Sequence, residues 1–417
     1  MIKSKDILIK DSKNKKIDKI INNNKTILLY DKQINNLLNI LKINNLIYNT
    51  FNKCNNNYYY SINLNNLINN NFDKNRNNIN NEKEENNVIK INNNSIINDK
   101  EHEKDYYDKK ITNFIKAEII IDDKNINKNI RILNSFEEFK KNYRITNIQK
   151  KNFYKYENEK EIKDNCQIQI NNNNINFSYF FEFKSVGKYN IEYRFRNNLT
   201  KIDFLFADCN LLTNIDLSNF NTEEVTNMRN LFFQCSSLKN INLTNINTQN
   251  VTNMAGLFLG CKSLINVDLS NFNTKKVIDI SGMFSDCKTL KTIDLYNFDT
   301  HNVIDMKGLF YGCTSLINVN LSSFKTKAVT EMSLMFQDCK SLTYLDLSSF
   351  NNKNAYNMMF MFNGCESLAY LNIINFTFDK NIQLMGIFGK CTSLKKENVI
   401  RKKNESFDLL LKHYHII

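Results

Sequence analysis

The second half of the chain repeats one pattern of apolar and polar residues every 26 positions. The unit reads L/M-F-x-x-C-x-S-L-x-x-I-D/N-L-S-x-F-N-T-x-x-V-x-x-M and starts eight times between 205 and 387. In I-D/N-L, apolar residues alternate with an acid or amide. In an extended chain the two apolar side chains would lie on one face and the polar one on the other, which predicts a short strand with one buried face. The final V-x-x-M spacing favours a loose helical turn.

This period predicts a solenoid, because stacked units complete a core that no unit buries alone. We expect the strands to lie side by side in a parallel sheet, with phenylalanines forming the opposite wall. The array covers 205–400, and its eighth unit is truncated. Late units depart from the pattern, since Asn352 and Phe378 stand where earlier units have threonine. The tail at 401–417 is predicted to be an amphipathic end cap.

Residues 112–204 predict a small β-rich domain that covers the first apolar edge of the array. The strands are expected at Ala117–Ile121, Ile130–Leu133, Cys166–Ile170, Ile175–Phe183 and Tyr189–Phe195, which are rich in β-branched and aromatic residues. A helix is expected around Phe136–Lys141 and a hairpin turn at Gly187.

Residues 1–111 are rich in Asn and Lys and low in complexity, so we expect a partly disordered region. Within it, Leu28–Tyr48 spaces its apolar residues as one face of a helix.

Charge separates the two halves of the chain. The formal net charge is +13, but 205–400 contains 16 Lys+Arg and 16 Asp+Glu. The basic excess therefore lies in the first 204 residues and the last 17. A solvated, lysine-rich chain is the expected meaning, with RNA or anionic-membrane binding through the N-terminal region as an alternative.

The array resembles the BspA-type leucine-rich repeats, and the motif FxxCxSLxxIDLSxFNTxxVTNM, as at Phe232–Met254, carries the resemblance. This resemblance implies a curved solenoid that binds other macromolecules, often as a cell-surface adhesin. The β-rich stretch ahead of the array also resembles segments found before such arrays. Because neither a signal peptide nor an apolar run of membrane-spanning length is visible, the sequence favours a cytoplasmic location, with the cell surface as the alternative.

One cysteine recurs in every unit: Cys209, Cys235, Cys261, Cys287, Cys313, Cys339, Cys365 and Cys391. We predict that these cysteines pack in the core as small apolar side chains. Side chains in register point in parallel, which disfavours disulfides between neighbours. A line of thiols does not converge on one metal ion, and no histidine recurs beside it to activate a nucleophile.

The outward strand positions form the candidate partner-binding face: Asp216, Asn242, Asp268, Asp294, Asn320, Asp346 and Asn372, with Tyr344 and Tyr370 as aromatic anchors. The competing interpretation is a solvated surface whose Asp and Asn side chains satisfy nearby backbone. A single file of acids does not give calcium its six to eight oxygen ligands. Since no catalytic, cofactor or metal motif is found, we expect a non-enzymatic scaffold for a protein partner, with nucleic acid not expected.

Overall fold

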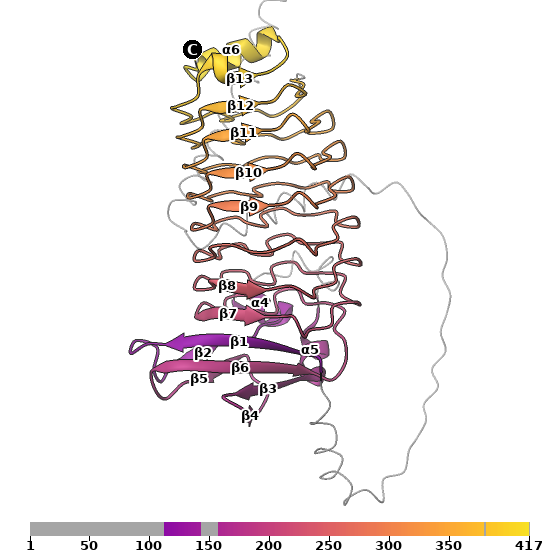
Figure 1. Ribbon diagram of the computed structural model, residues 1–417, viewed down its shortest axis with the longest axis vertical. Coiled ribbons are helices and arrows are strands. Elements are labelled where there is room, and N and C mark those ends of the chain that lie inside the picture. Colours follow the sequence, from indigo (N-terminus) through magenta and orange to yellow (C-terminus); the bar gives the residue numbers. More distant parts are fainter. Residues whose placement is uncertain (1–111, 143–156, 379–380, 417) are drawn as a thin grey trace, which may run out of the picture. The chain divides into compact units, whose positions relative to one another are not determined.

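The computed structural model of the protein describes residues 112–142, 157–378 and 381–416. All of them belong to one compact unit of the chain. Small mixed sheets dominate this part of the chain, and helices are few (Figure 1).

The low-complexity region at 1–111, with the helix expected at Leu28–Tyr48, lies outside the described residues. Within the described ranges, no helix is long and apolar enough to cross a membrane.

In the described residues, six strands and two short helices precede the repeats. They are β1 (Phe114–Ile121), β2 (Asn129–Arg131), α4 (Phe136–Asn142), α5 (Glu159–Asn165), β3 (Cys166–Ile170), β4 (Asn173–Ile175), β5 (Phe180–Glu182) and β6 (Gly187–Phe195). Burial alternates along β1 and β3, as the alternation of their apolar and polar residues predicted. Their inward side chains pack with Tyr193 and Phe195 of β6.

Two expectations for this part were wrong. The stretch predicted as one strand, Ile175–Phe183, is divided between β4 and β5, which lie in different sheets. The tight turn of this region is at Asn171 and Asn172, whose φ angles of 48° and 65° suit asparagine in a hairpin turn. Gly187 instead begins β6, which pairs with β1 and β3. The helix α5 was not predicted, because Ile162 is its only buried residue.

The first sheet continues into the repeats. Its strand order is β4-β3-β6-β1-β7-β8, in which β7 (Leu212–Asp216) and β8 (Asn240–Asn242) belong to the first two repeats. Strand β1 is antiparallel to both β6 and β7, whereas β7 and β8 are parallel. Because β1 pairs with β7, the first repeat has no open strand edge on this side.

The predicted single parallel sheet is divided into segments. Later repeats contribute β9 (Thr292–Asp294), β10 (Asn318–Asn320), β11 (Tyr344–Asp346), β12 (Tyr370–Asn372) and, after the 3-10 helix η3 (Lys396–Asn398), β13 (Val399–Ile400). Strands β9 and β10 pair in parallel, as do β11, β12 and β13. The third repeat has no regular strand at 266–268. Strands of three residues make few ladder bonds, so a small distortion ends a sheet.

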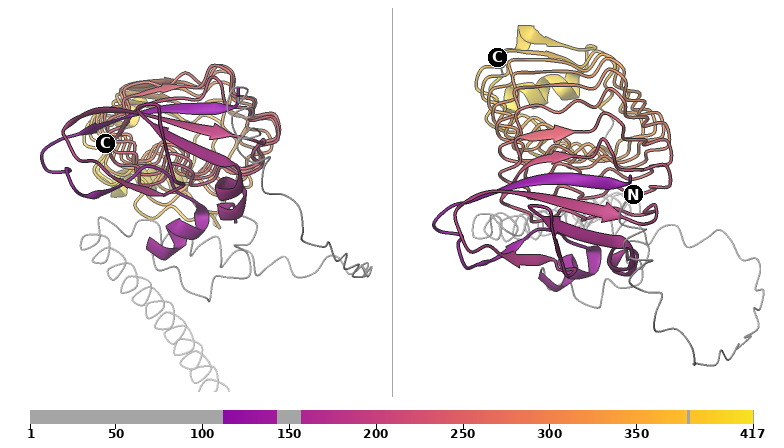
Figure 2. Two further views of the ribbon diagram at one scale, coloured as in Figure 1. Left: turned by 90° about the horizontal axis from the view of Figure 1, so that it is seen from below. Right: turned by 60° about the horizontal axis from the view of Figure 1, so that its bottom comes forward.

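Equivalent residues of successive repeats lie side by side along a second line. Single parallel bridges join residues 26 positions apart, from Lys201 and Asn227 to Asn357 and Gln383. Figure 2 shows the repeats superimposed when they are viewed along the stack. The V-x-x-M segment of each unit was predicted to form a loose helical turn. It contains these bridges and tight turns instead of a helix.

A column of phenylalanine rings runs through the core. The rings belong to Phe206, Phe232, Phe258, Phe284, Phe310, Phe336, Phe362 and Phe388. Neighbouring centroids are 5.5–6.0 Å apart and the rings are nearly parallel, at 5–16°. Each ring therefore fills the space between its two neighbours, and no unit buries its own ring completely.

The cysteine of each repeat lies beside this column. All nine described cysteines are buried and none is in a disulfide. From Cys235 to Cys391, each thiol donates a hydrogen bond to the carbonyl of the phenylalanine 29 residues earlier, at 3.0–3.3 Å. The cysteine therefore joins neighbouring repeats by a hydrogen bond as well as by packing.

We expect the described thiols to be inert in the native protein. Burial raises the pKa of every one of them, to about 12 for Cys391. The thiolate is the reactive form, so a thiol reagent at mildly alkaline pH should modify these cysteines only after denaturation. Mass spectrometry of native and denatured samples checks this; rapid native labelling of Cys313 would contradict it.

In each of the first five repeats, a buried threonine hydroxyl forms two hydrogen bonds to the backbone of the next repeat, and we call this pair of bonds the clasp. The hydroxyl of Thr248 donates to the carbonyl of Asn273 at 3.0 Å and accepts the amide of the same residue at 2.7 Å. The same pair of bonds forms at Thr222, Thr274, Thr300 and Thr326. Asn352 departs from the sequence pattern but keeps the clasp, because its amide donates to the Thr377 carbonyl and accepts from the Thr377 amide.

A helix follows the last repeat. Helix α6 (Glu405–His413) begins at Asn404, whose side chain accepts the amide of Phe407 at 2.9 Å. Phe407 and Leu411 are buried on its inner face, and the Phe407 ring lies 3.9 Å from that of Phe378. The amphipathic pattern of the tail is thus used to pack α6 on the final repeat.

Candidate interaction face

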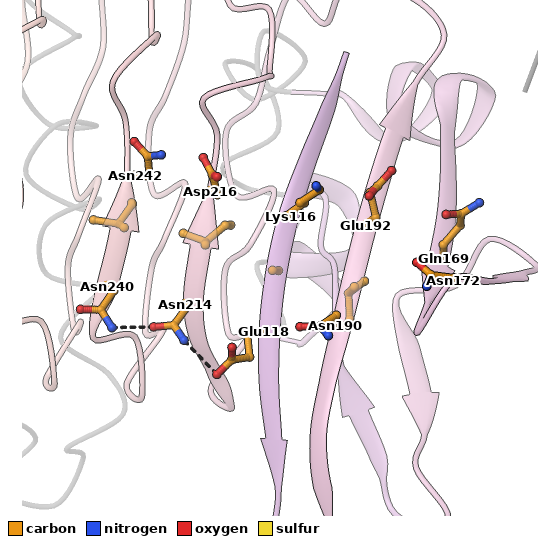
Figure 3. A pocket seen from close by; sticks show the side chains of 14 residues that line it. Lys116, Glu118, Gln169, Asn172, Asn190, Glu192, Asn214, Asp216, Asn240 and Asn242 are labelled. Atoms are coloured by element: carbon orange, nitrogen blue, oxygen red, sulfur yellow. Dashed lines mark hydrogen bonds between the residues drawn. The ribbon is translucent and has the colours of Figure 1, made fainter. Parts of the chain in front are cut away.

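The outward side chains of the first sheet form two polar rows across its strands. Pairing places Gln169, Glu192, Lys116, Asp216 and Asn242 in one row. The second row contains Asn190, Glu118, Asn214 and Asn240. Figure 3 shows both rows on one face of the sheet. We call this face, with its continuation over the outward strand residues of later repeats, the strand face.

The two rows line a shallow groove of about 500 Å³. Strands β1 and β6 supply one side of it and β7 and β8 the other, so it lies where the N-terminal sheet meets the repeats (Figure 3). Ten of its fourteen lining residues carry amide or charged side chains, and the other four are Ala117, Ile191, Ile215 and Ile241. The groove therefore suits a partner that both donates and accepts hydrogen bonds.

A chain of hydrogen bonds fixes the second row. The amide of Asn240 donates to Asn214 at 2.6 Å, and Asn214 donates to Glu118 at 2.9 Å (Figure 3). The other carboxylate oxygen of Glu118 forms an ion pair with Lys188. These side chains are held in place before any partner binds, which lowers the entropic cost of binding.

The predicted column of acids and amides has a structural role. Each side chain accepts, through Oδ1, the backbone amide two residues later, at 2.8–3.2 Å: Asp216, Asn242, Asp268, Asp294, Asn320, Asp346 and Asn372. Each of them therefore forms an Asx turn, which ends the strand in every one of these repeats except the third. Hydrogen bonds from Ser270 accordingly lower the pKa of Asp268. The column holds backbone in place while its second oxygens or amide nitrogens remain toward the outside.

The two tyrosines predicted as anchors lie together. Tyr344 and Tyr370 are partners in the β11–β12 register, and their rings stack at 4.6 Å and 5°. Tyr344 is 45% exposed. The stacked rings form an aromatic surface beside Asp346 and Asn372 of the column.

Sequence reasoning missed the apolar part of the strand face. Ile265, Tyr296, Ile317 and Ile400 are exposed there, with Tyr296 at 61%. The signal was present in the sequence, because Ile265 and Ile317 occupy the unit position of Lys239. The third, fourth, fifth and eighth repeats thus add an exposed apolar side chain, and the strand face changes from polar to partly apolar along the stack.

Asp305 belongs to a second column that also supports backbone. Its carboxylate accepts the amide of Lys307 at 2.9 Å, and Asp279 and Glu331 lie beside it in the adjacent repeats. Burial raises the pKa of Asp305 well above its usual value, and the carboxylates of Asp279 and Glu331 raise it further. In the described ranges, no group of three or more His, Cys, Asp or Glu is arranged to hold a metal ion.

Replacing Asp305 with asparagine should stabilise the protein near neutral pH. The native state keeps the Asp305 proton to a higher pH than the unfolded chain does, so wild-type stability falls as the pH rises above about 4. The side-chain oxygen of an asparagine can still accept the backbone amide of Lys307, as the side chain of Asn253 accepts a backbone amide in the same column. Because asparagine does not ionise, the loss of stability with rising pH is removed. Urea unfolding at several pH values should show a gain for Asp305→Asn at neutral pH and none at acid pH.

Asp268→Asn is the matched control, because the pKa of Asp268 is lowered by hydrogen bonding. Asp268 contributes stability that is present at neutral pH and lost as the pH falls, so this variant should show no gain. A neutral-pH loss of stability in Asp305→Asn would contradict the raised pKa.

Comparison with known families agrees with an array of repeats. A family model described as Mycoplasma protein of unknown function, DUF285, matches residues 200–295 and 283–401. The two overlapping matches cover the repeats and just under half of the chain. No curated protein and no solved structure matched the chain.

Proposed function

We propose that the protein is a non-enzymatic scaffold that binds a protein partner on the strand face of a leucine-rich solenoid. The observation that carries the proposal is the face itself, where a preorganised polar groove continues into exposed apolar side chains and the Tyr344–Tyr370 stack. Aromatic residues beside polar surface are typical of interface hot spots. The BspA-type resemblance of the repeat motif supports the same class of function.

We place the scaffold in the cytoplasm. Each repeat cysteine after the first donates its thiol proton to a backbone carbonyl, as Cys313 does to Phe284 at 3.0 Å. This bond requires a reduced thiol, which a reducing compartment preserves. The alternative, a cell-surface adhesin, rests on the resemblance, and labelling intact cells with a membrane-impermeant reagent distinguishes the two locations.

The test compares two pairs of alanine substitutions in the full chain. Tyr344→Ala with Tyr370→Ala removes the aromatic stack, whereas Ile278→Ala with Ile304→Ala removes apolar side chains of similar exposure outside the strand face. Partners captured by the wild type are identified by quantitative mass spectrometry, and the affinity of the purified complex is then measured.

We expect the tyrosine pair to weaken binding by about 30-fold, since a hot-spot truncation costs about 2 kcal/mol or more. The isoleucine pair should leave the affinity unchanged. Equal binding by both variants, or loss in the isoleucine pair alone, would refute the strand face as the binding surface.

A further inference from the structure

One corner of the stack is rich in exposed lysine. The corner is the N-T-x-x part of each unit, and in the third to sixth repeats it comprises 273–276, 299–302, 325–328 and 351–354. These four corners contain five lysines, one histidine and one acid, Asp299. We call the exposed basic set the basic ridge: Lys275, Lys276, His301, Lys325, Lys327 and Lys353.

Hydrogen bonds between repeats hold these corners in line. Three threonine hydroxyls form the clasp to the backbone of the next repeat: Thr274 with residue 299, Thr300 with residue 325 and Thr326 with residue 351. Side-chain amides add to this: Asn302 donates to the Lys275 carbonyl at 2.7 Å and Asn354 to the Lys327 carbonyl at 2.8 Å. Adjacent strand-like segments lie about 4.8 Å apart, so the ridge places at least one lysine on three of four successive repeats, with Asp299 and His301 at the corner of the remaining one.

Little of this charge is neutralised within the protein. Asp299 accepts a hydrogen bond from His301 at 2.8 Å and lies 3.9 Å from the Lys325 ammonium. Lys275, Lys327 and Lys353 form no ion pair with any residue of the described ranges. Three exposed ammonium groups in one line are therefore left to an external anion.

The charge of the corner changes along the stack. The first repeat has Glu223 and Glu224 there, and the second has Gln249 and Asn250. A different lysine column, at Lys262, Lys288 and Lys340, lies among acids instead: Lys288 is 4.0 Å from Asp286, and Lys340 is 3.1 Å from Glu366. Uncompensated lysine is thus a property of this corner and not of every lysine column.

We propose that the basic ridge binds a linear polyanion, namely a sulfated polysaccharide chain. Lysines that follow one line of corners over several repeats match anionic groups repeated along an extended polymer. The ridge contains no arginine, and its only ring, His301, is tied to Asp299, so it lacks the bidentate and stacking groups that read nucleic-acid bases. The charge lies along one line of corners, whereas a membrane surface calls for a broad basic surface.

The test uses heparin as the probe and the full chain as the protein. Lys275→Gln, Lys327→Gln and Lys353→Gln are combined in the ridge variant, and Lys262→Gln, Lys288→Gln and Lys340→Gln in the control. Both variants lose the same charge and leave the basic residues of 1–111 unchanged. Binding is measured by calorimetry over a range of salt concentrations.

At low salt we expect the ridge variant to bind heparin at least roughly tenfold more weakly than the wild type does. Its slope of log affinity against log salt should fall by roughly three, about one for each lysine removed. The control should retain the wild-type slope.

Equal losses in the two variants, or a wild type that does not bind heparin at low salt, would overturn the ridge as a polyanion site. Duplex DNA and anionic vesicles are tested in parallel. Binding to either that is as tight as heparin binding and depends on the ridge to the same degree would overturn the assignment to a sulfated polysaccharide.

Discussion

Replacing Phe310 with alanine is expected to lower the free energy of unfolding by about 3–5 kcal/mol. The ring is fully buried, and its centroid lies 5.6 Å from those of both Phe284 and Phe336. Truncation therefore leaves a cavity that touches two neighbouring repeats, and coupling between repeats is what stabilises a stacked array. The carbonyl of Phe310 also accepts the thiol of Cys339 at 3.1 Å, so a shift of the local backbone weakens a further contact.

Denaturant unfolding followed by circular dichroism measures the effect. Phe310→Leu should cost much less, since it keeps most of the apolar volume. Leu409→Ala, at a residue that is 69% exposed on α6, serves as the surface control and should be close to neutral. If Phe310→Ala and Leu409→Ala unfold at the same denaturant concentration, the ring column does not stabilise the stack.

Replacing Thr248 with valine is expected to lower the free energy of unfolding by about 1–3 kcal/mol. Valine has nearly the shape of threonine, so the packing is kept while both hydrogen bonds to the backbone of Asn273 are lost. Thr248 is only 1% exposed, whereas Asn273 is exposed and its backbone can bond to water once the hydroxyl is gone. The loss is therefore the net contribution of two hydrogen bonds, about 0.5–1.5 kcal/mol each.

Two substitutions at the same position separate the hydrogen bonds from the shape. Thr248→Ser keeps the hydroxyl and should lose only about 1 kcal/mol for the missing methyl. Thr248→Asn should also be tolerated better than valine, because Asn352 forms the same clasp. If the unfolding curves show the valine variant to be as stable as the serine variant, the two hydrogen bonds of the clasp do not contribute to the free energy of unfolding.

Much of the fold could be predicted because the signal is local and repeated. The 26-residue period placed the buried phenylalanines and cysteines correctly, since the same side chain in every unit meets the same neighbours. Strand β3 was predicted at its observed bounds, Cys166–Ile170. Failures occurred where one turn decided the outcome, as at Asn171, Asn172 and Gly187, because several turns were compatible with the same apolar residues.

The candidate site was predicted only in part. The sequence identified the outward column and the pair Tyr344 and Tyr370, which the structure stacks. It did not show the Asx turns that occupy Oδ1 of the column, nor the groove beside Glu118. Glu118 and Asn214 are 96 residues apart, and pairing of β1 with β7 brings them together.

The sequence by itself determined the period, the buried column and the neutral charge of the array, because these depend on the unit and its copies. Only the tertiary structure decided which strands of the preceding part meet the first repeat, where the sheet divides, and which lysines align without acids beside them. These features depend on contacts between residues far apart in the chain. A single-sequence pattern records the residue types at such contacts, but the register of strands and repeats decides which of them become neighbours.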